Sequence, residues 1–346
     1  VYPVVVGVPG EKPFSVTRKK IMFGAKSSIK KEGQKLKYQA GEQLMDKVDD
    51  IMNAIEDSLK KEPDSIAVAC YMLFKKGIRI GAKKETKNGT KGLLTLTWGK
   101  EVTREGGVIH FNFIGKDSVT DISDVDCGVE LAKAIEKAWK ACGKLKCTKT
   151  EIKDFVKKVA PEIPYTPKLT RTVVAANTMK DALKEVIKKY KLTKDSPVAL
   201  KKLAFNEANM EVAHKLNHQK GVNKTAEAKR ALKFEESKKK MVEREKKALQ
   251  TKAKREAQIA KLTESKKEGW QDKVKDIQAK MDKASMNLDI SKKNNEFKEA
   301  NQNFVSTTSK SAYIDPKIVK SFCEEVDLPI ESVYTSSLVD QFTDLM

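Results

Sequence analysis

The sequence predicts a mainly α-helical protein with a small antiparallel β part (α+β), and three observations support this fold class. Apolar residues recur at three- and four-residue steps over most of the chain, which is the period of an amphipathic helix. One short region alternates apolar and polar residues instead, as strands with one buried face do. Residues 222–300 are rich in Lys and Glu and contain no Pro and a single Gly, which predicts long helices.

The first part of the chain is predicted to be strand-like and then helical. Residues 1–24 are punctuated by Pro and Gly, and Val4–Val6 favour a strand that ends in a turn at Pro9-Gly10. A helical stripe begins after Gly41, and its apolar members are Leu44, Val48, Ile51, Met52, Ile55 and Leu59. Ser65 is expected to cap a second helix that is apolar on most sides.

Two alternating segments then predict an antiparallel hairpin around Gly106-Gly107. The inward side chains are expected to be Leu94, Leu96 and Trp98 in the first segment and Ile109, Phe111 and Phe113 in the second. Further helices are predicted around Leu131–Trp139, after Thr148, from near Leu169, and from Ser196-Pro197 to about His218, with a proline-rich loop before Leu169.

The Lys- and Glu-rich region has the spacing of a heptad seam in its second half. The seam residues are Trp270, Val274, Ile277, Met281, Ala284 and Leu288. Residues 265–269 can reverse the chain, so the pattern favours two long helices folded back as an antiparallel coiled coil. A single solvated helix and a disordered basic tail are the alternatives. After this region, Asp315 caps and Pro316 opens a short C-terminal helix.

The composition limits the classes of function. Lys and Arg number 69 against 48 Asp and Glu, so the net charge of +21 indicates a polyanionic partner, nucleic acid first and an anionic membrane surface second. No run of eighteen apolar residues exists that could span a membrane. The five cysteines are scattered, which favours free thiols in a reducing compartment over a zinc site. Walker, GxGxxG and HExxH motifs are absent, so no cofactor or metal is expected.

Tyr313 lies in the string SKSAYIDPKI, directly before the C-terminal helix. A lone tyrosine before a helix is usually a packing residue, but this string, with VDLPIESVY after it, closely resembles the active-site segment of eukaryotic-type DNA topoisomerase IB. Four other segments resemble that family's motifs in the family's order: GIRIG with Arg79, FNFIGKDSV with Lys116, KLTRT with Arg171, and NEANMEVAHKLNHQK with His218. The resemblance runs from about residue 20 to the C-terminus.

The resemblance implies a type IB topoisomerase or tyrosine recombinase-like catalytic core with a protruding linker. Residues 1–24 would be a remnant of the N-terminal cap strands, 25–221 the catalytic core, 222–302 the basic coiled-coil linker, and 303–346 the C-terminal domain with the active-site tyrosine. It implies a monomer that acts on double-stranded DNA, in the nucleus if the source is eukaryotic, and without a membrane partner.

The resemblance also implies a role for each motif residue. Tyr313 would attack a DNA phosphodiester and form a 3′-phosphotyrosyl ester, which keeps the bond energy, so that neither ATP nor a metal is required. Arg79 and Arg171 would offer paired donors to the charged transition state, and His218 would add another. Lys116 would protonate the leaving 5′ oxygen, its pKa lowered by nearby cations.

Each role has a structural alternative. Arg79 could cap a helix, Lys116 could be a solvated lysine, Arg171 a nonspecific phosphate contact, and His218 a surface histidine, with His214 the nearest decoy. His110 is expected on a polar strand face, and Asp117 could hold the lysine or approach the minor groove. The rival functions are a tyrosine recombinase and a non-catalytic basic coiled-coil protein that binds nucleic acid.

Three departures from the family pattern stand out. Only some 24 residues precede the helical body, where the family has a cap. Ala312 stands where many members have Asn, which puts sensitivity to camptothecin-type poisons in doubt, and Lys317 replaces the usual Arg.

Overall fold

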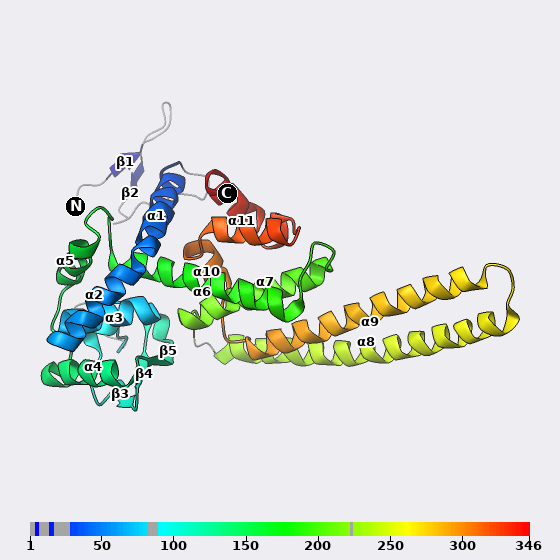
Figure 1. Cartoon of the computed structure of the whole chain (residues 1–346), viewed down its shortest axis with the longest axis horizontal. Helices are drawn as coiled ribbons and strands as arrows, with labels where there is room; N and C mark the ends of the chain where they lie inside the picture. The colour runs from blue at the N-terminus through cyan, green and yellow to red at the C-terminus, as the bar shows by residue number, and fades with distance from the viewer. Residues whose placement is uncertain (1–3, 7–13, 17–27, 82–88, 222–223) are drawn as a thin grey trace.

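The computed structural model describes residues 4–6, 14–16, 28–81, 89–221 and 224–346. It is mainly helical with a small antiparallel sheet, as the sequence predicts (Figure 1). The helices are α1 (Ser28–Asp46), α2 (Val48–Lys61), α3 (Ser65–Lys76), α4 (Val129–Cys142), α5 (Lys149–Val159), α6 (Pro167–Tyr190), α7 (Val198–Lys215), α8 (Lys224–Ser265), α9 (Trp270–Ala300), α10 (Thr307–Ala312), α11 (Pro316–Glu325) and α12 (Ser336–Phe342). The strands are β1 (Val4–Val6), β2 (Phe14–Val16), β3 (Val102–Glu105), β4 (Val108–Ile114) and β5 (Thr120–Asp126).

The first strand and the first helices differ from the prediction mainly in their boundaries. The strand at Val4–Val6 is confirmed and pairs with Phe14–Val16, whereas the turn expected at residues 9–10 lies outside the described residues. The predicted helix from Gly41 begins earlier, at Ser28, and breaks at Lys47 into α1 and α2. The cap of α3 is Asp64 and not Ser65, because the Asp64 carboxylate accepts from the Ala67 amide at 2.7 Å.

The β part is a three-stranded sheet in the order β3-β4-β5, and it corrects the predicted hairpin. Strand β4 holds Ile109, Phe111 and Phe113 buried, as expected, but its hairpin partner is β3 and not residues 94–98. Leu93–Thr95 is instead a 3₁₀ turn, closed by bonds between the Thr95 hydroxyl and Gly92. Strand β5 was not predicted from the sequence, because its exposed face is mostly acidic and polar.

The helices after the sheet are confirmed, with corrections at the two ends of α7. This helix starts at Val198, and Ser196, expected to cap it, instead accepts from the Thr193 amide. Thr148 caps α5 in a reciprocal capping box with Glu151, and Pro167 occupies the first turn of α6. Helix α7 was expected to reach about His218 but ends at Lys215. His218 therefore lies in the loop beyond α7, where Asn217 has a left-handed φ of 50° and turns the chain inward.

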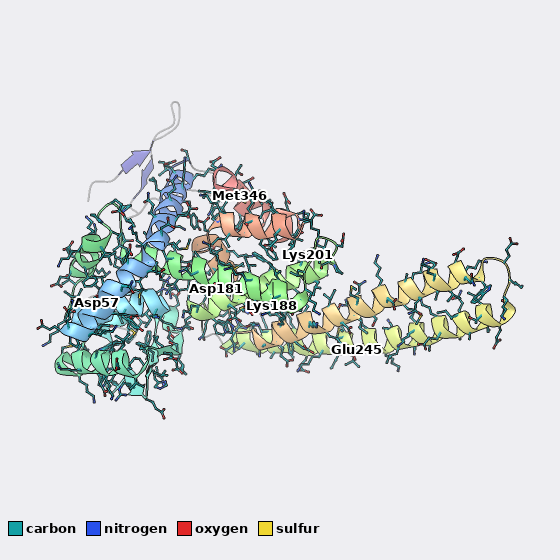
Figure 2. All side chains as sticks on the ribbon, viewed as in Figure 1. Asp57, Asp181, Lys188, Lys201, Glu245 and Met346 are labelled. Carbon is teal, nitrogen blue, oxygen red and sulfur yellow. The ribbon has the colours of Figure 1, made fainter. Side chains whose placement is uncertain are left out.

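Helices α8 and α9 form the predicted antiparallel hairpin, reversed near Gly269, and Figure 1 shows it projecting from the body. Ile277 and Met281 of the predicted seam are buried, whereas Ala284 is exposed. Figure 2 shows side chains on all sides of the hairpin, with Glu245 near the middle of α8, and most residues of the two helices are exposed. Because this region is rich in Lys and Glu, its two helices are largely solvated and meet along a narrow apolar seam.

Two hydrophobic clusters form the body, and α6 contributes to both. Leu169 and Val173 pack in the cluster of α2, α3, α4 and the sheet. Val174 and Met179 pack in the second cluster, with α7 and the C-terminal helices. The first turns of α6 therefore lie where the two halves of the body meet.

Candidate active site

Arg171 lies in the second turn of α6 and is 4% exposed. Its Nη1 donates to the Gly77 carbonyl, and its Nη2 donates to the Leu216 carbonyl at 3.0 Å and to Nε2 of His218 at 3.3 Å. Its Nε is buried without a hydrogen-bond partner among the described residues. Buried donors rarely lack a partner, so the described residues leave the hydrogen bonding of this N–H incomplete.

Gly77 makes this arrangement possible at the end of α3. Its φ of 68° is left-handed, and a Cβ there would lie 2.8 Å from Leu216 Cδ2. Glycine accepts this backbone conformation without the steric cost that other residues carry. The close approach brings the carbonyls of Gly77 and Leu216 to the two ends of one guanidinium.

His218 is buried beside Arg171. A guanidinium only donates, so Nε2 of His218 accepts here, and the neutral ring carries its proton on Nδ1, 3.3 Å from Ser309 Oγ. Burial, together with the charges of Arg171 and Arg79, lowers the pKa of the ring from 6.5 to about 3. The imidazole is therefore neutral over the whole physiological range.

Tyr313 follows the last turn of α10 and is 7% exposed. Its ring stacks on His218 with centroids 5.2 Å apart, and the guanidinium carbon of Arg171 lies 5.0 Å from its centroid. Burial acts to raise the pKa of the phenol, but the nearby positive charges of Arg171 and Arg79 outweigh it, and the pKa is lowered. This tyrosine is a buried aromatic side chain with an acidified hydroxyl.

Arg79 and Lys116 lie on the open side of this cluster. Arg79 is half-buried in the segment after α3, and Lys116 opens the 3₁₀ turn that follows β4. The Lys116 side chain is 64% exposed, with its Nζ 3.6 Å from a carboxylate oxygen of Asp117.

Two adjoining cavities join the five residues. Both are lined by Arg79, Lys91, Lys116 and Arg171; one also reaches His218, and the other reaches Tyr313. The structure thus brings all five predicted site residues together from distant parts of the chain. Cationic donors around one phenol form a site for a phosphate group.

Two family models match the chain. The eukaryotic DNA topoisomerase I catalytic core matches residues 26–255, and a C-terminal topoisomerase domain matches residues 284–344. The chain belongs to the eukaryotic DNA topoisomerase I family. Among its relatives, it is 29% identical to DNA topoisomerase 1 alpha of Arabidopsis thaliana and 27% identical to DNA topoisomerase 1 of Homo sapiens, over 94% of its own length in each case. It spans 36% and 43% of the length of these two proteins.

Three side chains of this candidate site were not expected from the sequence. Lys91 and Lys168 line the cavities, and Ser309 bonds His218. Lys168 lies three residues before Arg171 and Ser309 four before Tyr313, so nearness to the motifs could have indicated both. Lys91 lies in a basic turn with no motif, and only its packing reveals it.

Other candidates lie elsewhere. His214, the alternative to His218, faces the base of the hairpin. Its ring centroid lies 4.0 Å from that of Phe304, and its Nε2 lies 2.6 Å from Oδ1 of Asn301. His110 pairs with Asp124 across β4 and β5. Within the described residues, no group of three His, Cys, Asp or Glu side chains could hold a metal ion, and each helix is too short or too polar to cross a bilayer.

The two sequence departures near the tyrosine both contact α1. The carbonyl of Ala312 accepts from Lys37 Nζ at 3.0 Å. Lys317 pairs with the Glu42 carboxylate at 2.7 Å. These contacts tie the C-terminal segment to α1 on either side of Tyr313.

Proposed function

We propose that this chain is the catalytic part of a type IB DNA topoisomerase, which relaxes supercoiled duplex DNA by transient cleavage of one strand. The observation that carries the proposal is the contact of one acidified phenol, Tyr313, with a neutral histidine and a buried arginine in a cavity lined by cations. Such a site favours a phosphodiester as substrate and a phenolate as nucleophile.

In the proposed reaction, the Tyr313 oxygen attacks the scissile phosphorus and forms a 3′-phosphotyrosyl ester as the bond to the 5′ oxygen breaks. The Tyr313 proton passes to water, and the positive charges of Arg171 and Arg79, which lower the pKa of the phenol, favour its loss. Arg171 offers its unpartnered Nε to a non-bridging oxygen. Lys116 protonates the leaving 5′ oxygen, and reversal of these steps religates the strand.

His218 would act as a neutral donor. When a phosphate oxygen also takes up Nη2 of Arg171, Nε2 of His218 is released, and the tautomer with its proton on Nε2 can donate to the phosphate. The neutral state of the ring, with its pKa near 3, makes this role independent of pH above that value.

The remaining assignments are part of the same proposal. Residues 25–221 form the catalytic core, 222–302 a basic coiled-coil linker near the rotating duplex, and 303–346 the domain that carries the nucleophile, with 1–24 belonging to the cap. The enzyme acts as a monomer in the nucleus, in support of replication and transcription. The net charge of +21 favours phosphate contacts, weak sequence preference and strong salt dependence.

The test is relaxation of a plasmid without any recombination site, in EDTA and without ATP. The wild-type chain is expected to relax it and to leave a covalent protein–DNA complex in detergent, whereas Tyr313→Phe binds DNA and does neither. Activity restricted to a specific DNA site would favour a recombinase. Equal behaviour of wild type and Tyr313→Phe would favour a non-catalytic DNA-binding protein.

A further inference from the structure

A closed ring of contacts surrounds the end of β4, from which the Lys116 turn begins. The Lys91 amide donates to the Ile114 carbonyl at 2.7 Å, and the Asn112 amide donates to the Glu101 carbonyl at 2.9 Å. The side chains of Lys91 and Glu101 close the ring, with Nζ 2.9 Å from Oε1. Two segments thus hold the same strand end and are joined to each other by one ion pair.

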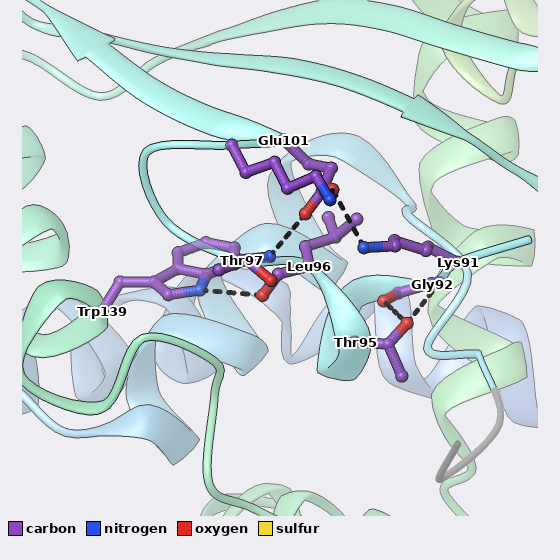
Figure 3. A network of polar contacts seen from close by, with 8 residues as sticks. Lys91, Gly92, Thr95, Leu96, Thr97, Glu101 and Trp139 are labelled. Carbon is purple, nitrogen blue, oxygen red and sulfur yellow. Dashed lines mark hydrogen bonds and ion pairs between the residues drawn. The ribbon is translucent and has the colours of Figure 1, made fainter. Parts of the chain in front are cut away.

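This ion pair is nearly buried, with side-chain exposures of 11% for Lys91 and 8% for Glu101. The second carboxylate oxygen of Glu101 accepts from the Thr97 amide at 2.9 Å, as Figure 3 shows. Burial acts to raise the pKa of Glu101, but the bonds from Lys91 and Thr97 lower it overall. The carboxylate therefore stays ionised, and both of its oxygens are bound.

The segment that begins at Lys91 also lies along Arg79. The Leu93 amide donates to the Arg79 carbonyl at 3.0 Å, and the backbones of Gly81 and Gly92 are so close that a Cβ on Gly92 would lie 2.4 Å from Gly81 Cα. Side-chain-free residues are required for this approach. One segment therefore connects the backbone of Arg79 with the strand end that precedes Lys116.

Lys116 depends on this backbone support more than the other site residues do. Its side chain is 64% exposed, and its ion pair is with the adjacent Asp117, so packing does little to place its ammonium. The turn itself places left-handed φ angles of 63° and 58° on Asp117 and Ser118. Strained turns of this kind persist when the surrounding structure holds them.

We propose that Glu101 is a positioning residue for the cleavage reaction: through Lys91, its carboxylate holds the Lys116 turn where the ammonium reaches the leaving 5′ oxygen. The inference rests on the proposed function above. Glu101 contacts no reacting atom and acts by fixing the distance between the Arg79 and Lys116 segments. A displacement of about 1 Å at such a group can slow a reaction on the order of 100-fold.

The test compares two duplex oligonucleotides in single-turnover cleavage by the full chain. One has the ordinary 5′ oxygen at the scissile bond, and the other has sulfur in its place. A thiolate is a far better leaving group than an alkoxide and needs no proton, so the sulfur substrate does not depend on Lys116. Glu101→Ala is expected to cleave the oxygen substrate about 10- to 100-fold more slowly and the sulfur substrate at nearly the wild-type rate.

The matched control is Glu105→Ala, which removes the same charge from an exposed position on the same hairpin and is expected to cleave both substrates like wild type. Glu101→Gln breaks the ion pair with a smaller change of shape and is expected to show the same substrate difference if Glu101→Ala does not fold. Equal slowing on both substrates, or no slowing on either, would overturn the inference. Cleavage of neither substrate by wild type would overturn the proposed function, and this inference with it.

Discussion

Replacing His218 by Gln is expected to remove an acid sensitivity of the fold. The folded state lowers the pKa of the ring from 6.5 to about 3, so it excludes a proton that the unfolded chain binds. The stability that the neutral ring contributes is complete above about pH 6.5 and is lost as the pH falls toward 3. At about pH 5 the loss in free energy of unfolding reaches about 2 kcal/mol.

Urea unfolding followed by circular dichroism at about pH 8 and about pH 5 measures this difference. Between the two conditions, wild type is expected to lose about 2 kcal/mol more than His218→Gln, because glutamine does not titrate. Equal losses in the two proteins would refute a buried neutral ring at this position.

His218→Gln also shows whether residue 218 acts as a neutral hydrogen-bond donor or through a positive charge. Glutamine keeps an N–H that can reach a phosphate oxygen, whereas His218→Ala removes it and is expected to slow cleavage about 100-fold. His214→Gln, outside both cavities, is the control and should cleave like wild type. Wild-type cleavage that falls with a midpoint near pH 6.5, in a profile that His218→Gln lacks, would contradict the neutral donor.

Three further outcomes follow from the structure. Arg171→Lys is expected to abolish relaxation and to lower the free energy of unfolding by about 2 kcal/mol. An ammonium cannot donate to the buried carbonyls of both Gly77 and Leu216. Plasmid relaxation measures the first effect and urea unfolding the second. Asp64→Ala removes the cap of α3 and is expected to lower the free energy of unfolding by about 1 kcal/mol in the same assay, with relaxation unchanged. Replacing 222–302 by a short flexible loop should leave the body folded, because Gln219 and Phe304 are already paired at its base. It should also weaken the salt dependence of DNA binding, measured by titration at several salt concentrations.

Local patterns predicted the elements whose stability is decided within a few residues. The helix start after Thr148 and the Asp315 cap are each decided within a single turn, and both are confirmed. Errors arose where contacts distant in sequence decide the outcome. The alternation around Leu94 is typical of a strand, but the chain there bends around the Thr95 hydroxyl and packs beside Arg79. Ala284 fits the heptad spacing yet is exposed.

By itself, the sequence determined the helical class, the projecting hairpin and the types of residue available for chemistry, since apolar periodicity and motif order are properties of neighbouring residues. The tertiary structure alone decided which of these residues are buried, charged and in contact. The bond from Arg171 to Gly77 spans 94 positions, and that from His218 to Ser309 spans 91. Packing of α3 on α6 creates the first bond, and packing of α10 on α7 creates the second. Burial and the charges of Arg171 and Arg79 together lower the pKa of His218, whereas the same charges lower the pKa of Tyr313 against the effect of burial.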